Sequence, residues 1–167
     1  MRLRLVAAAI AFNALTLPLS PASAQEAAGT EKGDVALLVS GASYHVGQRT
    51  YRDENGQSRK WNEFNPGLGL EVQLSRHFYL AAGGYKNSIH KPSLYAGIGA
   101  ETDSRRRWGL GVQAGLITGY EIPVVPSAIP YLRIGRQDKA NVKINVIPPI
   151  KGLTPAVAAV QLRIPIG

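Results

Sequence analysis

Two side chains in this sequence have the types that could carry out acid–base chemistry together, His45 and Ser88. A histidine titrates near neutral pH and can take a proton from a hydroxyl group, and a serine hydroxyl can attack or polarise an ester carbonyl. The pair is weak evidence by itself, because loop histidines and serines are usually only solvated. No Gly-x-Ser-x-Gly motif occurs, and no acidic third partner is evident beside either residue.

Metal and thiol chemistry find little support in the sequence. The three histidines, His45, His77 and His90, do not have the spacing of a metal site, and the chain contains no cysteine. The lack of cysteine excludes thiol catalysis, thiolate metal sites and a disulfide scaffold. We therefore expect neither a metal nor a nucleotide cofactor.

The elements that must position these side chains are predicted to be β-strands. No sustained helical period follows residue 25, whereas aliphatic residues alternate with Gly, Glu and Gln in the runs 68–74 and 108–116, and again in 142–146. Clusters of polar residues, glycine and proline mark the turns. About eight strands result, near residues 34–46, 63–74, 77–87, 93–102, 107–119, 128–135, 140–147 and 156–165.

The connections alternate between short and long, which is typical of an up-and-down antiparallel β-barrel of the bacterial outer membrane. Short turns fall near 75–77, 102–106 and 135–139, and long loops near 47–62, 86–92, 119–127 and 148–155. Several strands have about the 9–11 residues that a tilted strand needs to cross a bilayer. In such a barrel His45 and Ser88 reach the same outer rim, separated by one intervening strand. A soluble lipocalin-like barrel is the structural alternative, and it would place the aliphatic face inside.

Glycines and prolines in the strands permit two interpretations each. Seven glycines concentrate in the middle strands, where they could leave a slot for an acyl chain, with Gly99 as its floor, or could relieve crowding in a narrow barrel. Pro66, Pro130 and Pro148 each remove a ladder donor, so they could open lateral gaps or could mark strand ends.

The N-terminus predicts export. Arg2 and Arg4 precede an apolar run that ends at Pro18, and Ala22-Ser23-Ala24 is a small-residue cleavage site, so we expect a signal peptide over 1–24 and a single barrel domain over 25–167. The net charge of +8 falls by two, to +6, when Arg2 and Arg4 leave. For an exported chain this charge favours anionic lipid or lipopolysaccharide phosphates over nucleic acid, although it is equally typical of a solubilising surface.

Several short segments, in order along the chain, resemble the PagP family of lipid A palmitoyltransferases, which are eight-stranded outer-membrane barrels. Ser43-Tyr44-His45 looks like the family's histidine before the long first loop, and 62–70 is similar to its Asn-Glu, proline and glycine-rich second strand. Tyr85-Lys86-Asn87-Ser88 resembles an aromatic-Lys-Asp-Ser motif, with asparagine where the family has aspartate. Ala96-Gly97-Ile98-Gly99 is similar to the run whose last glycine floors the acyl pocket.

The resemblance implies transfer of a palmitoyl chain from a phospholipid to a hydroxyl of lipid A, by a monomer in the outer membrane. His45 would be the base, and Ser88 would polarise the ester carbonyl or hold the oxyanion. Asn87 would belong to the catalytic group, and Tyr85 to the substrate-binding residues. Pro66, Pro130 and Pro148 would mark lateral gateways. Two other functions remain open: a noncatalytic structural or adhesive barrel, and a hydrolase of lipid A or phospholipid that uses His45 and Ser88.

Overall fold

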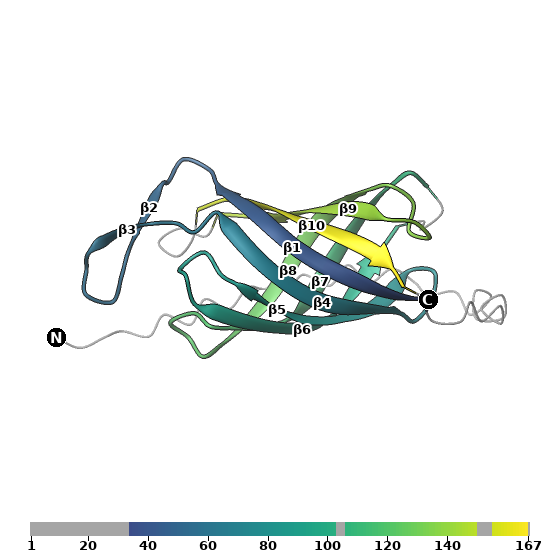
Figure 1. Ribbon diagram of the computed structural model, residues 1–167, viewed down its shortest axis with the longest axis horizontal. Helices are drawn as coiled ribbons and strands as arrows, with labels where there is room; N and C mark the ends of the chain where they lie inside the picture. Colours follow the sequence, from purple (N-terminus) through teal and green to yellow (C-terminus); the bar gives the residue numbers. More distant parts are fainter. Residues whose placement is uncertain (1–33, 103–105, 150–154, 167) are drawn as a thin grey trace, which may run out of the picture. The chain divides into compact units, whose positions relative to one another are not determined.

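Eight strands close into one antiparallel up-and-down barrel, and two short strands form a separate hairpin (Figure 1). The structure is a computed structural model that describes residues 34–102, 106–149 and 155–166, so the expected signal peptide lies outside the described residues. The barrel strands are β1 (Val35–His45), β4 (Phe64–Gln73), β5 (Phe78–Lys86), β6 (Pro92–Glu101), β7 (Trp108–Thr118), β8 (Val124–Ile134), β9 (Asn141–Ile147) and β10 (Val157–Pro165). The hairpin consists of β2 (Thr50–Arg52) and β3 (Ser58–Lys60). The barrel predicted from the sequence is confirmed.

The two ends of the barrel differ in their connections. One end carries the β2–β3 hairpin, the connections 87–91 and 119–123, the end of β9 and the start of β10, and we call it the hairpin end. The other carries the connections 74–77 and 135–140, the end of β6 and the start of β7, together with Asp34 and Ile166, and we call it the turn end. Strands β1 and β5 both run toward the hairpin end, so His45 and Ser88 lie at the same end of the barrel.

The aliphatic face of the strands points outward, as the alternation predicted, and not inward as in a lipocalin. Seven of the eight barrel strands carry exposed large aliphatic side chains, and Val39 of β1 is half-buried on the same face. The exposed aliphatic residues include Leu68, Leu70, Leu80, Leu94, Ile98, Leu110, Val112, Leu116, Val124, Ile134, Val146, Val160 and Leu162. Exposed aromatic residues flank this band, with Tyr44 and Phe64 at the hairpin end and Phe78 and Trp108 at the turn end. An apolar band between aromatic residues is the surface of a membrane-spanning barrel. None of the described residues forms a helix that is long and apolar enough to cross a membrane.

The glycines of the inner face allow neighbouring strands to approach closely. Gly69 pairs with Gly83, and Gly97 pairs with Gly115. A Cβ at any of these four positions would overlap backbone atoms of the adjacent strand. Crowding in a narrow barrel therefore explains these glycines, because the backbone itself occupies the space that a side chain would need.

The sixth barrel strand begins earlier than predicted. β8 starts at Val124, not near residue 128, and it pairs with β7 along its full length from Thr118–Val124 to Trp108–Ile134. Pro126 lies in the segment 119–127 that was expected to be a loop, whereas Pro130 lies in the expected strand 128–135. Both prolines lie within β8 with their rings directed outward.

Candidate active site

Charged side chains fill the lumen near the turn end. Glu71 accepts a hydrogen bond from Arg163 Nε at 2.6 Å and forms a second ion pair with Lys143. Glu101 pairs with Arg133 in the same way and accepts a hydrogen bond from the Tyr131 hydroxyl at 2.8 Å. All of these side chains are buried, so this half of the lumen is a packed network of compensated charges.

Two tyrosine rings lie within this network, and glycines make room for them. The Lys143 ammonium lies 4.2 Å from the centroid of the Tyr79 ring and 4.8 Å from that of Tyr131, close enough for cation–π attraction. A Cβ at Gly99 would overlap the ring of Tyr79, and one at Gly111 would overlap that of Tyr131. Gly99, the residue expected to floor an acyl slot, therefore lies under the Tyr79 ring.

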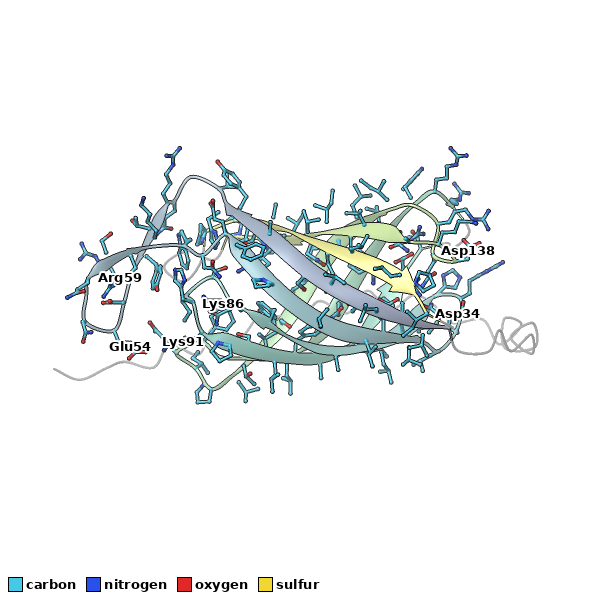
Figure 2. The ribbon with its side chains drawn as sticks, viewed as in Figure 1. Asp34, Glu54, Arg59, Lys86, Lys91 and Asp138 are labelled. Atoms are coloured by element: carbon cyan, nitrogen blue, oxygen red, sulfur yellow. The ribbon has the colours of Figure 1, made fainter. Side chains whose placement is uncertain are left out.

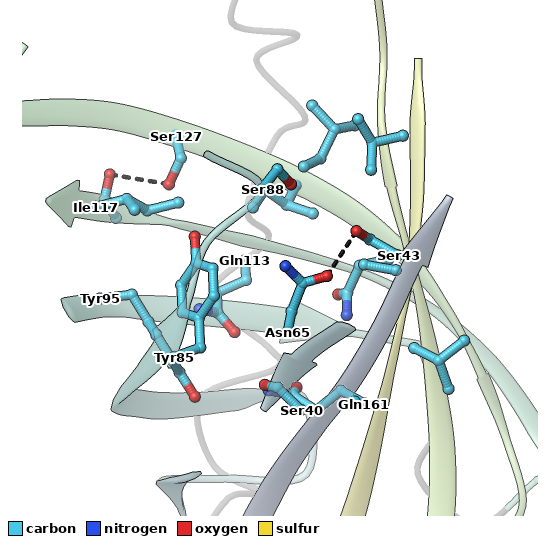
Figure 3. Close-up of a pocket in the computed structure, with 18 of the residues that line it drawn as sticks. Ser40, Ser43, Asn65, Tyr85, Ser88, Tyr95, Gln113, Ile117, Ser127 and Gln161 are labelled. Atoms are coloured by element: carbon cyan, nitrogen blue, oxygen red, sulfur yellow. Dashed lines mark hydrogen bonds between the residues drawn. The ribbon is translucent and has the colours of Figure 1, made fainter. Parts of the chain in front are cut away.

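A cavity of about 130 Å³ occupies the lumen toward the hairpin end (Figure 3). Half of its lining residues are apolar or glycine, among them Ile117, Ile129 and Val157. The rest carry hydroxyl or amide groups, and Ser40, Ser43, Asn65, Tyr85, Ser88, Tyr95, Gln113 and Gln161 are labelled in Figure 3. Of the middle-strand glycines, Gly115 belongs to the lining. The cavity can enclose a mixed ligand with an apolar chain and a polar group.

His45 ends β1 beside this cavity. It pairs with Val157, which lines the cavity, and Ser43, two residues earlier, lines it as well. The residue is only 3% exposed, and its Nδ1 is buried with no hydrogen-bond partner. The imidazole stacks on Trp61 with 4.5 Å between ring centroids and 3° between ring planes.

Ser88 lines the cavity and follows Asn87, whose side chain organises the 87–91 turn. The Asn87 amide donates to Ser93 Oγ at 3.0 Å and to the Gly119 carbonyl at 2.8 Å, and its Oδ1 accepts from the backbone N–H groups of Ile89 and Lys91. These four bonds use both amide protons and both oxygen lone pairs, and none of them goes to His45. An aspartate here could not donate to the Gly119 carbonyl, which gives a structural reason for asparagine.

Two further asparagines connect the histidine and serine regions across β4. The Asn62 N–H donates to the Ser88 carbonyl at 2.8 Å, and Asn62 Nδ2 donates to the Asn87 carbonyl at 3.0 Å. Asn65 Nδ2 donates to the Lys86 carbonyl at 3.0 Å, and Asn65 Oδ1 accepts from Ser43 Oγ at 2.6 Å (Figure 3). Backbone pairing of β4 with β5 ends at Gly67–Tyr85, so these amides continue the contact past Pro66, which has no N–H.

Tyr85 also belongs to the cavity wall. Its hydroxyl lies 3.3 Å from that of Tyr120, in the 119–123 connection, so a tyrosine pair bridges β5 and the far side of the cavity. Tyr120, Trp61 and Asn65 were not identified from the sequence as site residues. Asn65 lies within the motif 62–70, whereas the ring contacts of Trp61 and Tyr120 depend on loop geometry and left no pattern in the sequence.

The ladder between β8 and β9 stops halfway along the barrel. It runs from Ile134–Val142 to Tyr131–Asn145, and the next positions of this register, Pro130 opposite Val146 and Ile129 opposite Ile147, are not paired. Pro148 lies directly after β9, exposed at the same edge. Two of the three prolines expected at lateral gaps, Pro130 and Pro148, thus lie at an unpaired edge of the described barrel near the hairpin end. The third, Pro66, points outward on β4, where asparagine side chains bond β4 to the chain that follows β5.

The hairpin projects from the barrel and carries mixed charges (Figure 2). Arg59 pairs with Asp53 at 3.0 Å, and Lys91 pairs with Glu54 at 2.6 Å across to the 87–91 turn. The Arg59 guanidinium holds the pKa of the Asp53 carboxyl below its usual range. Among the described residues, no group of three or more histidine or carboxylate side chains is arranged to hold a metal ion.

Comparison with known proteins adds evidence on the fold alone. No protein-family model matches this sequence, and no curated protein matches it. Among solved structures, the chain is similar to a de novo designed protein called TMB2.3, with a TM-score of 0.58, 16% identity, and coverage of 81% of this chain and 95% of that one. It is also similar to a structure described as de novo design of transmembrane beta-barrels, with a TM-score of 0.57, 13% identity, and coverage of 80% and 96%. The chain has the fold of a small transmembrane β-barrel.

Proposed function

We propose that this protein is an acyltransferase of the Gram-negative outer membrane, which moves a palmitoyl or similar chain from a phospholipid to a hydroxyl of lipid A. The observation that carries the proposal is the chain of contacts that links His45 to Ser88 through Trp61 and Asn62. Trp61 stacks on the imidazole, and the next residue, Asn62, binds the Ser88 carbonyl beside a partly apolar cavity. The resemblance of the motifs around these residues to the PagP family supplies the substrate class.

The reaction follows from the two side chains. His45 Nε2 is the reacting nitrogen, because Nδ1 is buried, and it removes the proton of the acceptor hydroxyl. The resulting oxygen attacks the ester carbonyl carbon of the phospholipid, and the Ser88 hydroxyl donates to the oxyanion that forms. The tetrahedral species then expels the glycerol oxygen of the donor, which recovers the proton from His45.

The cavity and the unpaired β8–β9 edge suit lipid substrates. An acyl chain fits the apolar part of the cavity wall, and the edge at Pro130 and Pro148 gives a lateral path between this cavity and the bilayer. Unpaired backbone groups are costly in hydrocarbon, so such an edge is tolerated where polar headgroups or a bound lipid can contact it. The protein is expected to act as a monomer in contact with phospholipid and lipopolysaccharide.

Mass spectrometry of lipid A tests this function directly. We expect lipid A from a Gram-negative host that expresses the chain to gain the mass of one palmitoyl group, and His45→Ala or Ser88→Ala to lower this gain by roughly 100-fold or more. His90→Asn is the matched control, because His90 is exposed at the same end and has a positive φ that asparagine tolerates.

The alternative functions give different results in the same experiment. Lipid A that loses an acyl chain would indicate a hydrolase. Unchanged lipid A, with folded protein present in the outer membrane, would contradict the proposal and leave a structural or adhesive barrel.

A further inference from the structure

Three aromatic rings connect the outer hairpin with the end of β1. The His45 imidazole lies face to face with the Trp61 indole, with 4.5 Å between centroids and planes within 3° of parallel. Among the described residues, the second aromatic ring against the indole is that of Tyr51 of β2, with 4.7 Å between centroids and an interplanar angle of 31°. Sheet pairing does not require this arrangement, because Trp61 lies outside the strands, between β3 and β4.

The stack with Trp61 can orient the His45 imidazole, a role that a hydrogen bond has in most histidine bases. Such a base is usually oriented by an acceptor at Nδ1, either a carboxylate or a carbonyl oxygen. Here Nδ1 of His45 is buried and has no partner, and Asn87 uses all four of its hydrogen bonds elsewhere. Packing against the indole therefore sets the plane of the imidazole.

Trp61 is itself held at two points of the backbone. The backbone N–H of Trp61 donates to the Arg49 carbonyl at 3.3 Å, which closes the base of the hairpin. The following residue, Asn62, is bonded to the carbonyls of Asn87 and Ser88. The backbone segment that carries the indole is thus bonded to the carbonyl of Ser88, and the indole in turn lies against the imidazole of His45.

We propose that Trp61 is a positioning residue for His45: its indole face, carried by the 61–62 segment, orients the imidazole toward Ser88 and the cavity in place of a hydrogen bond from Nδ1 to an acidic partner. Trp61 touches no reacting atom. The inference rests on the proposed function, because it assigns Trp61 a role in the reaction of His45.

The test compares Trp61→Leu with Trp61→Phe, which keeps an aromatic face, and with Trp108→Leu as the control. Trp108 is the other tryptophan of the chain and lies outward at the start of β7. Each variant of the full barrel is first shown to fold by its changed mobility in unheated detergent gels. Three measurements follow: the NMR resonances of the His45 ring, identified with His45→Gln; the rate of His45 modification by diethyl pyrocarbonate; and kcat and KM for acyl transfer.

We expect Trp61→Leu to remove the ring-current shift of the His45 resonances and to speed modification of the ring about tenfold. We also expect kcat to fall about 10- to 100-fold while KM changes less than about threefold, because misplacing a reacting group affects the reaction more than binding. Trp61→Phe should change each of the three measurements much less than Trp61→Leu does. Trp108→Leu should leave all three at their wild-type values.

Unmoved His45 resonances or an unchanged modification rate in Trp61→Leu would overturn the proposal. An unchanged kcat, in a protein that His45→Ala inactivates, would overturn it as well. A wild-type protein that transfers no acyl chain would contradict the proposed function instead, and the resonances and modification rate would then decide the positioning of His45.

Discussion

The buried charges near the turn end stabilise the barrel only as a complete set. Glu71 is fully buried and compensates both Lys143 and Arg163, so Glu71→Gln leaves two buried cations without their counter-charge. We expect this substitution to lower the free energy of unfolding by about 3–5 kcal/mol, measured by urea titration of the barrel in lipid vesicles. Glu54→Gln, which breaks the exposed pair with Lys91, should leave the urea midpoint unchanged. Equal midpoints for the two variants would contradict this account of the network.

At the scale of the elements, the edge between β8 and β9 is where the closed barrel is weakest. Successive N–H groups of a strand point to opposite sides, so part of the Ser127–Ile129 backbone faces the unpaired positions of β9. In hydrogen exchange measured by NMR, we expect amides of this stretch that face β9 to exchange faster than those of Leu132–Ile134, which are paired on both sides. Uniform protection along β8 would show that the ladder continues past Tyr131 and would remove the lateral path.

For the whole molecule, the apolar band of outward-facing aliphatic side chains determines the position of the barrel in a bilayer. The two tryptophans test this, because Trp108 lies outward on β7 and Trp61 stacks on His45 beyond the barrel strands. In vesicles of lipids brominated on their acyl chains, Trp61→Phe, which keeps Trp108, should lose most of its fluorescence. Trp108→Phe, which keeps Trp61, should be quenched much less. Equal quenching of the two single-tryptophan variants would contradict the proposed position of the apolar band within the bilayer.

The sequence by itself determined the barrel, its strand count and the direction of its faces. These features are local, because a period of two places every second side chain on one face, and turn residues mark where each strand ends. The runs 68–74 and 108–116 therefore showed an aliphatic face before any pairing was known. Chain order in an up-and-down barrel also brought His45 and Ser88 to one end, since β1 and β5 run in the same direction.

Only the tertiary structure decided what surrounds those residues. Pro126 lies in the segment 119–127 that was expected to be a loop, but β8 includes it, because pairing with β7 along the full length holds the strand on one side. Gly99 lies under Tyr79 because the two residues face each other across β5 and β6. The contact of Trp61 with His45 joins residues 16 positions apart through an irregular loop, and no periodic pattern encodes such a contact. Side chains that meet across the lumen or through a loop are set by packing, which a linear pattern does not record.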